Sequence, residues 1–101
     1  MAKINNYLGL CKKANYLIIG ADNLKKYSKK LYLLVVCGEI TNTIKKTVQD
    51  VISEYNNLDC IITNEDFSGA IGIKNCKIVG IKNKGMSEEI LKNNSEYKKW
   101  N

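Results

Sequence analysis

The run LYLLVVC, residues 31–37, constrains the fold of this 101-residue chain more than any other segment. Its near-continuous apolar side chains suit a strand that is covered on both faces, because a strand with one wet face alternates apolar and polar residues. A strand of this kind needs other elements packed on each side of its sheet. The run therefore predicts a layered α/β fold, and the chain length predicts one domain.

Shorter apolar runs and helical stripes alternate around this strand. Further strands are predicted at 17–19, 60–63 and 77–81, and helices at 3–14, 22–30, 41–55, 65–71 and after Ser87. Thr41 or Asn42 is expected to cap the third helix, Gly72 to end the fourth in an αL turn, and Ser87 to cap the fifth. The order implies βαβ crossovers and a sheet covered on both faces. We expect one domain over 1–92 and a polar C-terminal tail over 93–101.

The four cysteines and the absence of histidine argue against a metal site. Cys11, Cys37, Cys60 and Cys76 form no CxxC pair, and the chain has no histidine. Cys37 and Cys60 lie in apolar runs, where cysteine packs as a small hydrophobic residue. We expect reduced, buried thiols and no bound metal.

Positive charge is concentrated in one half of the sequence. Residues 1–50 carry nine lysines and three acidic residues, whereas residues 51–101 carry seven of each. Such asymmetry suggests a surface that faces a polyanion. All 16 basic residues are lysine, so bidentate arginine contacts to guanine are not available. Lysine-rich solubility is the alternative explanation of the same charge.

Nothing in the sequence predicts insertion into a membrane. Apolar runs stay far below the roughly 20 residues needed to cross a bilayer. The stretch MAKINNYLGL lacks the long apolar region of a signal peptide. We therefore expect a cytoplasmic protein with no membrane partner.

The junction IIGADNLKK, residues 18–26, joins an apolar run to a lysine-bearing helix through one glycine. A phosphate site is one reading, but the glycine-rich motifs of nucleotide-binding loops are missing, and Asp22 would repel a phosphate. Catalysis is a second reading, since several carboxylates follow predicted strands: Asp22, Glu39, Glu65 and Asp66. Helix caps and turns explain these carboxylates better, and there is no histidine to act as a base. We expect no catalytic residue, no enzyme activity and no small-molecule cofactor.

The third reading is a helix start that contacts RNA bases. Asp22 and Asn23 can accept hydrogen bonds from guanine, and Lys26 can donate to a guanine or a phosphate. Further lysines flank them and would meet backbone phosphates: Lys25, Lys29 and Lys30.

The order of elements, together with four segments, resembles the ribosomal protein L-seven-Ae / L-thirty-e family of kink-turn RNA-binding proteins. The segments are LGLCKKANYLIIG, GADNLKK on the motif G-[AT]-[NK]-[EQ]-x-x-K, LYLLVVCGEITNTIKK, and TNEDFSGAIG on the motif S-K-x-x-L-G-x-A-x-G. KIVGIKNKGMSEEI resembles the ending of the small stand-alone bacterial members. The resemblance implies a three-layer α/β/α sandwich with a four-stranded mixed sheet, and a monomer that binds structured ribosomal or kink-turn RNA, or the ribosome.

The resemblance also implies an RNA-binding site. Gly20 would let the backbone approach the RNA, Asp22 and Asn23 would face guanines of sheared G·A pairs, and Lys26 would contact guanine or phosphate. Of the other implied contacts, Glu39 and Ile40 lie on the loop after the second strand. Thr63 and Asn64 form the polar pair before the short helix, and Ile73 and Lys74 lie on the loop after that helix.

The motif is altered in this chain. Asp22 stands where the family has Asn or Lys, Asn23 where it has Glu or Gln, and Asn64 where it has Lys. The shorter side chain at position 23 reduces its reach by about 1.3–1.5 Å, more than the useful range of a hydrogen bond. A protein-docking or ribosome-docking module on the same fold, without tight RNA binding, is the alternative function.

Overall fold

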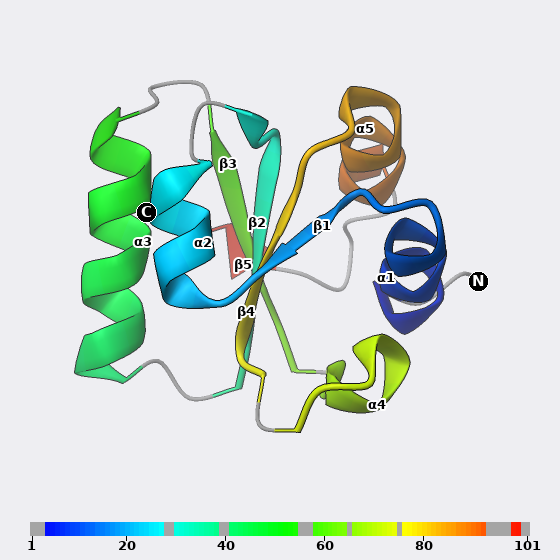
Figure 1. Cartoon of the computed structure of the whole chain (residues 1–101), viewed down its shortest axis with the longest axis horizontal. Helices are drawn as coiled ribbons and strands as arrows, with labels where there is room; N and C mark the ends of the chain where they lie inside the picture. Colours follow the sequence, from blue (N-terminus) through cyan, green and yellow to red (C-terminus); the bar gives the residue numbers. More distant parts are fainter. Residues whose placement is uncertain are drawn as a thin grey trace.

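The computed structural model describes residues 4–27, 30–38, 41–54, 58–64, 66–74, 76–92 and 98–99. Helices and strands alternate along this part of the chain (Figure 1). The elements in chain order are α1 (Ile4–Lys13), β1 (Leu17–Ile19), α2 (Ala21–Lys26), β2 (Leu33–Cys37), α3 (Asn42–Glu54), β3 (Asp59–Thr63), α4 (Ser68–Ile71), β4 (Ile78–Ile81), α5 (Lys84–Lys92) and β5 (Lys98–Lys99).

The sheet is mixed, with strand order β1-β4-β2-β3-β5. Strands β2 and β3 are parallel, whereas β4 runs antiparallel to both β1 and β2. The four predicted strands therefore form the predicted mixed sheet. Among neighbouring strands only β2 and β3 are joined by a βαβ crossover, because β4 lies between β1 and β2. The two-residue strand β5 extends the β3 edge and was not predicted.

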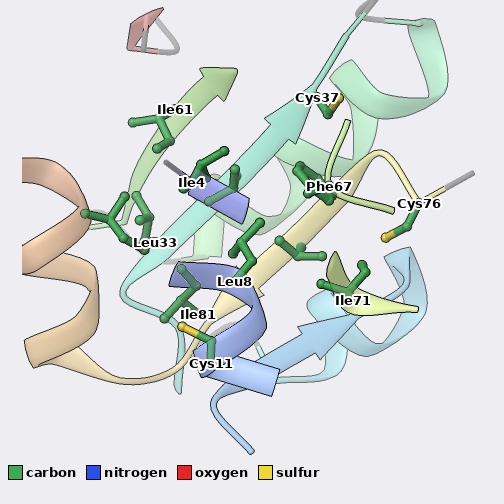
Figure 2. Packing of buried hydrophobic residues seen from close by; sticks show 13 residues of the cluster. Ile4, Leu8, Cys11, Leu33, Cys37, Ile61, Phe67, Ile71, Cys76 and Ile81 are labelled. Atoms are coloured by element: carbon green, nitrogen blue, oxygen red, sulfur yellow. The ribbon is translucent and has the colours of Figure 1, made fainter. Parts of the chain in front are cut away.

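Helices cover both faces of this sheet, which confirms the three-layer α/β/α sandwich. Figure 1 shows α2 and α3 on one side and α1, α4 and α5 on the other. The α1 side holds one buried cluster, seen in Figure 2, to which Leu8, Phe67 and Ile90 contribute. The α3 side holds the other, to which Leu24, Val36 and Val48 contribute. All five residues of β2 are buried, as the unbroken apolar run predicts.

The ends of three helices test the predicted caps. The hydroxyl of Thr41 accepts a hydrogen bond from the Ile44 N–H at 3.2 Å, so Thr41 caps α3 as expected. Gly72 ends α4 in the left-handed conformation, with φ 73° and ψ 22°, also as expected. The prediction for α5 is wrong. Asn83 is its cap, because its side-chain oxygen accepts from the Met86 N–H at 2.8 Å, and Ser87 lies inside the first turn.

Two helices are shorter than their sequence patterns predict. Helix α2 ends at Lys26 rather than residue 30, since the backbone of Tyr27 leaves the helical region at φ −111° and ψ 23°. Helix α4 begins at Ser68, where the Asp66 carboxylate accepts a hydrogen bond from the Ser68 N–H at 3.0 Å. This bond lowers the pKa of the Asp66 carboxyl group below its usual value. Asp66 therefore acts at a helix start, which is the structural role expected of such carboxylates.

All four cysteines are buried and free, which confirms that they pack as small hydrophobic residues. Burial raises the pKa of the Cys11 thiol to about 11 and that of Cys60 to about 12. Within the described residues, no three cysteine, histidine or acidic side chains lie close enough together to hold a metal ion. The described helices are also too short or too polar to cross a bilayer.

Candidate nucleic-acid interface

One end of the sheet brings together the segments that the sequence marks as RNA-binding. The ladders pair Ile19 with Val79 and Cys37 with Thr63, so the carboxyl ends of β1, β2 and β3 lie beside the start of β4. Two backbone bonds hold this end together: Cys37 N–H donates to Lys77 at 2.9 Å, and Gly38 N–H donates to Thr63 at 3.2 Å. We call this end of the sheet, where these strands meet their loops, the loop end. Figure 1 shows that α2 and α3 both start near it.

A shallow pocket of about 360 Å³ opens at the loop end. Isoleucines contribute an apolar part of its lining, namely Ile19, Ile44 and Ile78. Its polar and charged lining comes from segments far apart in sequence, with Gly20 after β1, Thr41 and Thr43 at the start of α3, and Lys74 and Lys77 before β4. We call this feature the apical pocket. It joins three of the predicted RNA contacts, Gly20, Ile73 and Lys74.

The chain turns sharply into α2 at Gly20. Gly20 has φ 96° and ψ 141°, a backbone conformation that side-chain-bearing residues rarely adopt. The residues that follow, Asp22 and Asn23, are exposed. The Asn23 amide nitrogen donates to the Ile19 carbonyl at 2.9 Å, which fixes the amide beside the end of β1. Polar acceptors at the start of α2 are thus displayed to solvent next to the apical pocket.

The two neighbouring lysines of α2 serve different surfaces. Lys25 forms an ion pair with Asp50 of α3, with 3.2 Å between Nζ and Oδ2. Lys26 instead lies near the ring of Tyr27, with its ammonium 5.4 Å from the ring centroid. Successive helical residues point about 100° apart, which explains the division. Because exposed ion pairs contribute only about 0–1 kcal/mol, Lys25 is restrained weakly.

The remaining predicted contacts are distributed unevenly. Lys29, Glu39 and Ile40 lie outside the described residues. Asn64 and Lys74 are exposed, and Ile73 is 39% exposed. Thr63, the last residue of β3, is only 4% exposed. Of Thr63 and Asn64, therefore, only Asn64 is exposed at the end of β3.

A second groove, which the sequence did not indicate, lies on the other side of the β1–α2 junction. It measures about 530 Å³ and is lined by Leu17, Ile18, Ile19, Asn23, Tyr27, Lys30 and Lys82. We call it the edge groove. Tyr27 stands four residues after Asn23, so helical spacing could have suggested that these two share a face. Lys82 could not have been found this way, since it reaches the groove only through the pairing of Leu17 with Ile81.

Comparisons with known proteins support the fold of this chain but give no information on its function. No protein-family model matches the chain, and no curated protein matches it either. A protein of unknown function from Bacillus halodurans C has a similar structure, with a TM-score of 0.76 and 22% sequence identity. The match covers 91% of this chain and 96% of that one. The chain therefore shares its α/β fold with the Bacillus halodurans protein.

Proposed function

We propose that this chain is a non-enzymatic RNA-binding protein that recognises structured, kink-turn-like RNA through the loop end of its sheet. The supporting observation is convergence: Gly20 and Lys74, far apart in sequence, line the apical pocket, and Asn64 follows the end of β3 at the same end of the sheet. We further propose that it works in the bacterial cytoplasm, with the ribosome or translation machinery, and without a cofactor.

Charge around the loop end fits a polyanion. Lys74 and Lys77 line the apical pocket, and Lys26 lies on the exposed side of α2. Phosphate contacts of this kind supply most of the affinity of a nucleic-acid-binding protein and orient it on its target. Each ammonium acts as a point charge, because lysine lacks the fork geometry of arginine.

Base recognition would fall to the start of α2. The Asp22 carboxylate only accepts hydrogen bonds, and it suits the N–H groups of a guanine edge. The Asn23 amide both donates and accepts, and its bond to Ile19 holds it in one place. The Asp22 carboxylate also repels phosphate groups, so its position favours contact with a base over contact with the RNA backbone.

The test is the binding of a kink-turn RNA, with a regular duplex of the same length as the reference RNA. Lys26→Ala and Lys74→Ala should each weaken binding. Each should also make the slope of log affinity against log salt shallower by about one, because one phosphate contact is lost. With about four or five contacts, log affinity should fall with log salt with a slope of about −3 to −4. Lys92→Ala, at the exposed end of α5, is the matched control and should bind like the parent protein.

Three outcomes would count against the proposal. They are an affinity that does not change with salt, equal binding of the kink-turn and the regular duplex, and equal effects of Lys26→Ala and Lys92→Ala. The alternative of a protein-docking module gains support from the isoleucines that line the apical pocket. It predicts millimolar or absent RNA binding together with capture of a protein partner that Ile73→Asp abolishes.

A further inference from the structure

The edge groove combines three features that bear on its ligand. One wall is the edge strand β1, which has a neighbouring strand, β4, on one side only in the described sheet. The opposite wall carries an aromatic ring, Tyr27, and the amide of Asn23. Two cations, Lys30 and Lys82, complete the lining. Apolar surface, an aromatic ring and positive charge together are what an unpaired nucleotide requires of its site.

The Tyr27 side chain is partly exposed, and two lysine ammonium groups lie over its ring. Tyr27 is 37% exposed and directly follows the last residue of α2, the helix that packs against the sheet through Leu24. The ammonium groups of Lys26 and Lys30 lie 5.4 and 5.8 Å from the ring centroid. A base that stacks on this ring would displace at least one of these ammonium groups, and lysine side chains are long and flexible enough to move from the ring to the phosphates of the nucleotide.

The size and position of the groove agree with one nucleotide. Its volume of about 530 Å³ lies within the usual range for a small-molecule site. Ile19 lines both the edge groove and the apical pocket, so an RNA strand bound at the loop end could continue into the groove. Asn23, bonded to Ile19, stands at the junction of the two.

We propose that the edge groove binds one unpaired nucleotide of the bound RNA, with its base stacked on Tyr27 and its phosphate held by Lys30 and Lys82. This inference rests on the proposed RNA-binding function. It adds a single-stranded subsite to a surface that otherwise recognises folded RNA. An acidic peptide would need only the positive charge of the lysines. The aromatic ring and the amide are additional features that suit a base, so they favour a nucleotide over such a peptide.

The experiment measures binding of a single-stranded adenylate of about eight nucleotides and of its abasic counterpart, which keeps the phosphates. Tyr27→Leu should weaken adenylate binding about fivefold or more, because a stacked base contributes that much or more. Tyr27→Phe should keep the affinity within about twofold, since stacking needs the ring and not the hydroxyl. Lys82→Ala should weaken binding of both oligomers and reduce the salt dependence.

Tyr32→Leu is the matched control. Tyr32 is 41% exposed and does not line the groove, so its loss should leave adenylate binding within about twofold of the parent. Thermal unfolding of each variant checks that the fold is intact.

The inference is overturned if the adenylate does not bind, if Tyr27→Leu and Tyr32→Leu behave alike, or if the abasic oligomer binds as tightly as the adenylate. It is also overturned if an aspartate-rich peptide binds in a Tyr27-dependent manner and the adenylate does not. Kink-turn binding that depends on Lys26 but not on Tyr27 would defeat this inference alone. Tyr27-dependent adenylate binding without kink-turn binding would defeat only the proposed function.

Discussion

Replacement of Gly80 by alanine should reveal how closely α2 packs on the sheet. Gly80 lies in β4, opposite Ile18 of β1 and Leu34 of β2. A Cβ atom at this position would lie 2.6 Å from Cδ2 of Leu24, which belongs to α2, and 2.5 Å from Cδ2 of Leu31. Both leucines are fully buried. The missing side chain thus makes room for the helix that carries the candidate interface.

The expected cost follows from these distances. Non-bonded carbon atoms pack at about 3.5–4.0 Å, so each leucine methyl group must retreat by about 1 Å within a close-packed core. Overpacking of this kind typically lowers the free energy of unfolding by about 1–3 kcal/mol. Because Gly80→Ala creates two clashes at once, we expect a cost in the upper half of that range, about 2–3 kcal/mol. Alanine recovers about 0.5–1 kcal/mol of backbone entropy. We expect a net loss of about 1–2 kcal/mol in the free energy of unfolding, or about 5–15 °C in melting temperature.

Thermal and urea denaturation measure this loss, and Gly9→Ala is the control. A Cβ atom on Gly9, within α1, meets nothing within 4 Å, so alanine there should raise stability by up to about 1 kcal/mol. The reasoning fails if Gly80→Ala melts at the parent temperature or above it. It also fails if the combined Gly80→Ala and Leu24→Ala variant loses the full sum of the two single effects, since removing the Leu24 side chain should relieve one clash.

Three further predictions concern helix ends and thiols. Asn83→Ala should lower the free energy of unfolding by about 1 kcal/mol in urea titrations, because the Met86 N–H loses its acceptor; an unchanged midpoint would contradict this cap. Gly72→Ala should cost about 1–2 kcal/mol in the same assay, because its φ of 73° is unfavourable for alanine, and a neutral effect would refute the argument. The free energy of unfolding should fall as the pH rises from 9 towards 11. The reason is that unfolded thiols ionise near 9.0, whereas burial keeps the folded pKa of Cys11 at about 11 and that of Cys60 at about 12. Cys60→Ala should make this fall shallower, and equal pH slopes for the variant and the parent would contradict the prediction.

Sequence patterns predicted the elements and layers of this fold well because burial leaves a clear periodic signal. The unbroken apolar run of β2 is buried as predicted, and Ile44, Val48 and Val51, which recur at helical spacing along α3, are buried as well. Strand direction leaves a weaker signal. The reversed direction of β4, which separates β1 from β2, cannot be read from four short apolar runs.

Local competition explains the errors at individual residues. Both Asn83 and Ser87 can cap a helix, and only packing decides: the Ser87 side chain is buried inside the first turn, where its hydroxyl donates to the Asn83 carbonyl at 2.8 Å. Strand β5 consists of two lysines, so its pairing with Ile61 and Ile62 of β3 has no apolar signature. Thr63 was predicted as the last residue of a strand and as an RNA contact, but its place at the end of the parallel β2–β3 pair leaves it buried.

The candidate site was predicted in part. The positions after β1 and β3 could be brought together from the order of elements, whereas the position before β4 was grouped with them only through the family resemblance, because it depends on the reversed direction of β4. The structure places all three at one end of the sheet. The edge groove could not be predicted, because Lys82 meets Asn23 and Tyr27 only through an antiparallel contact with distant residues.

The position of β4 has a consequence for how the chain acquires its structure. In the described sheet β1 bonds only to β4, which joins Ile18 to Gly80 across most of the sequence. Contacts between such distant residues close late, since the entropy of the intervening loop must be lost first. During synthesis the first strand must therefore wait, without a partner, until Ile81 has left the exit tunnel. A nascent chain stalled before that point should remain open to proteases, and one stalled well after it should become resistant.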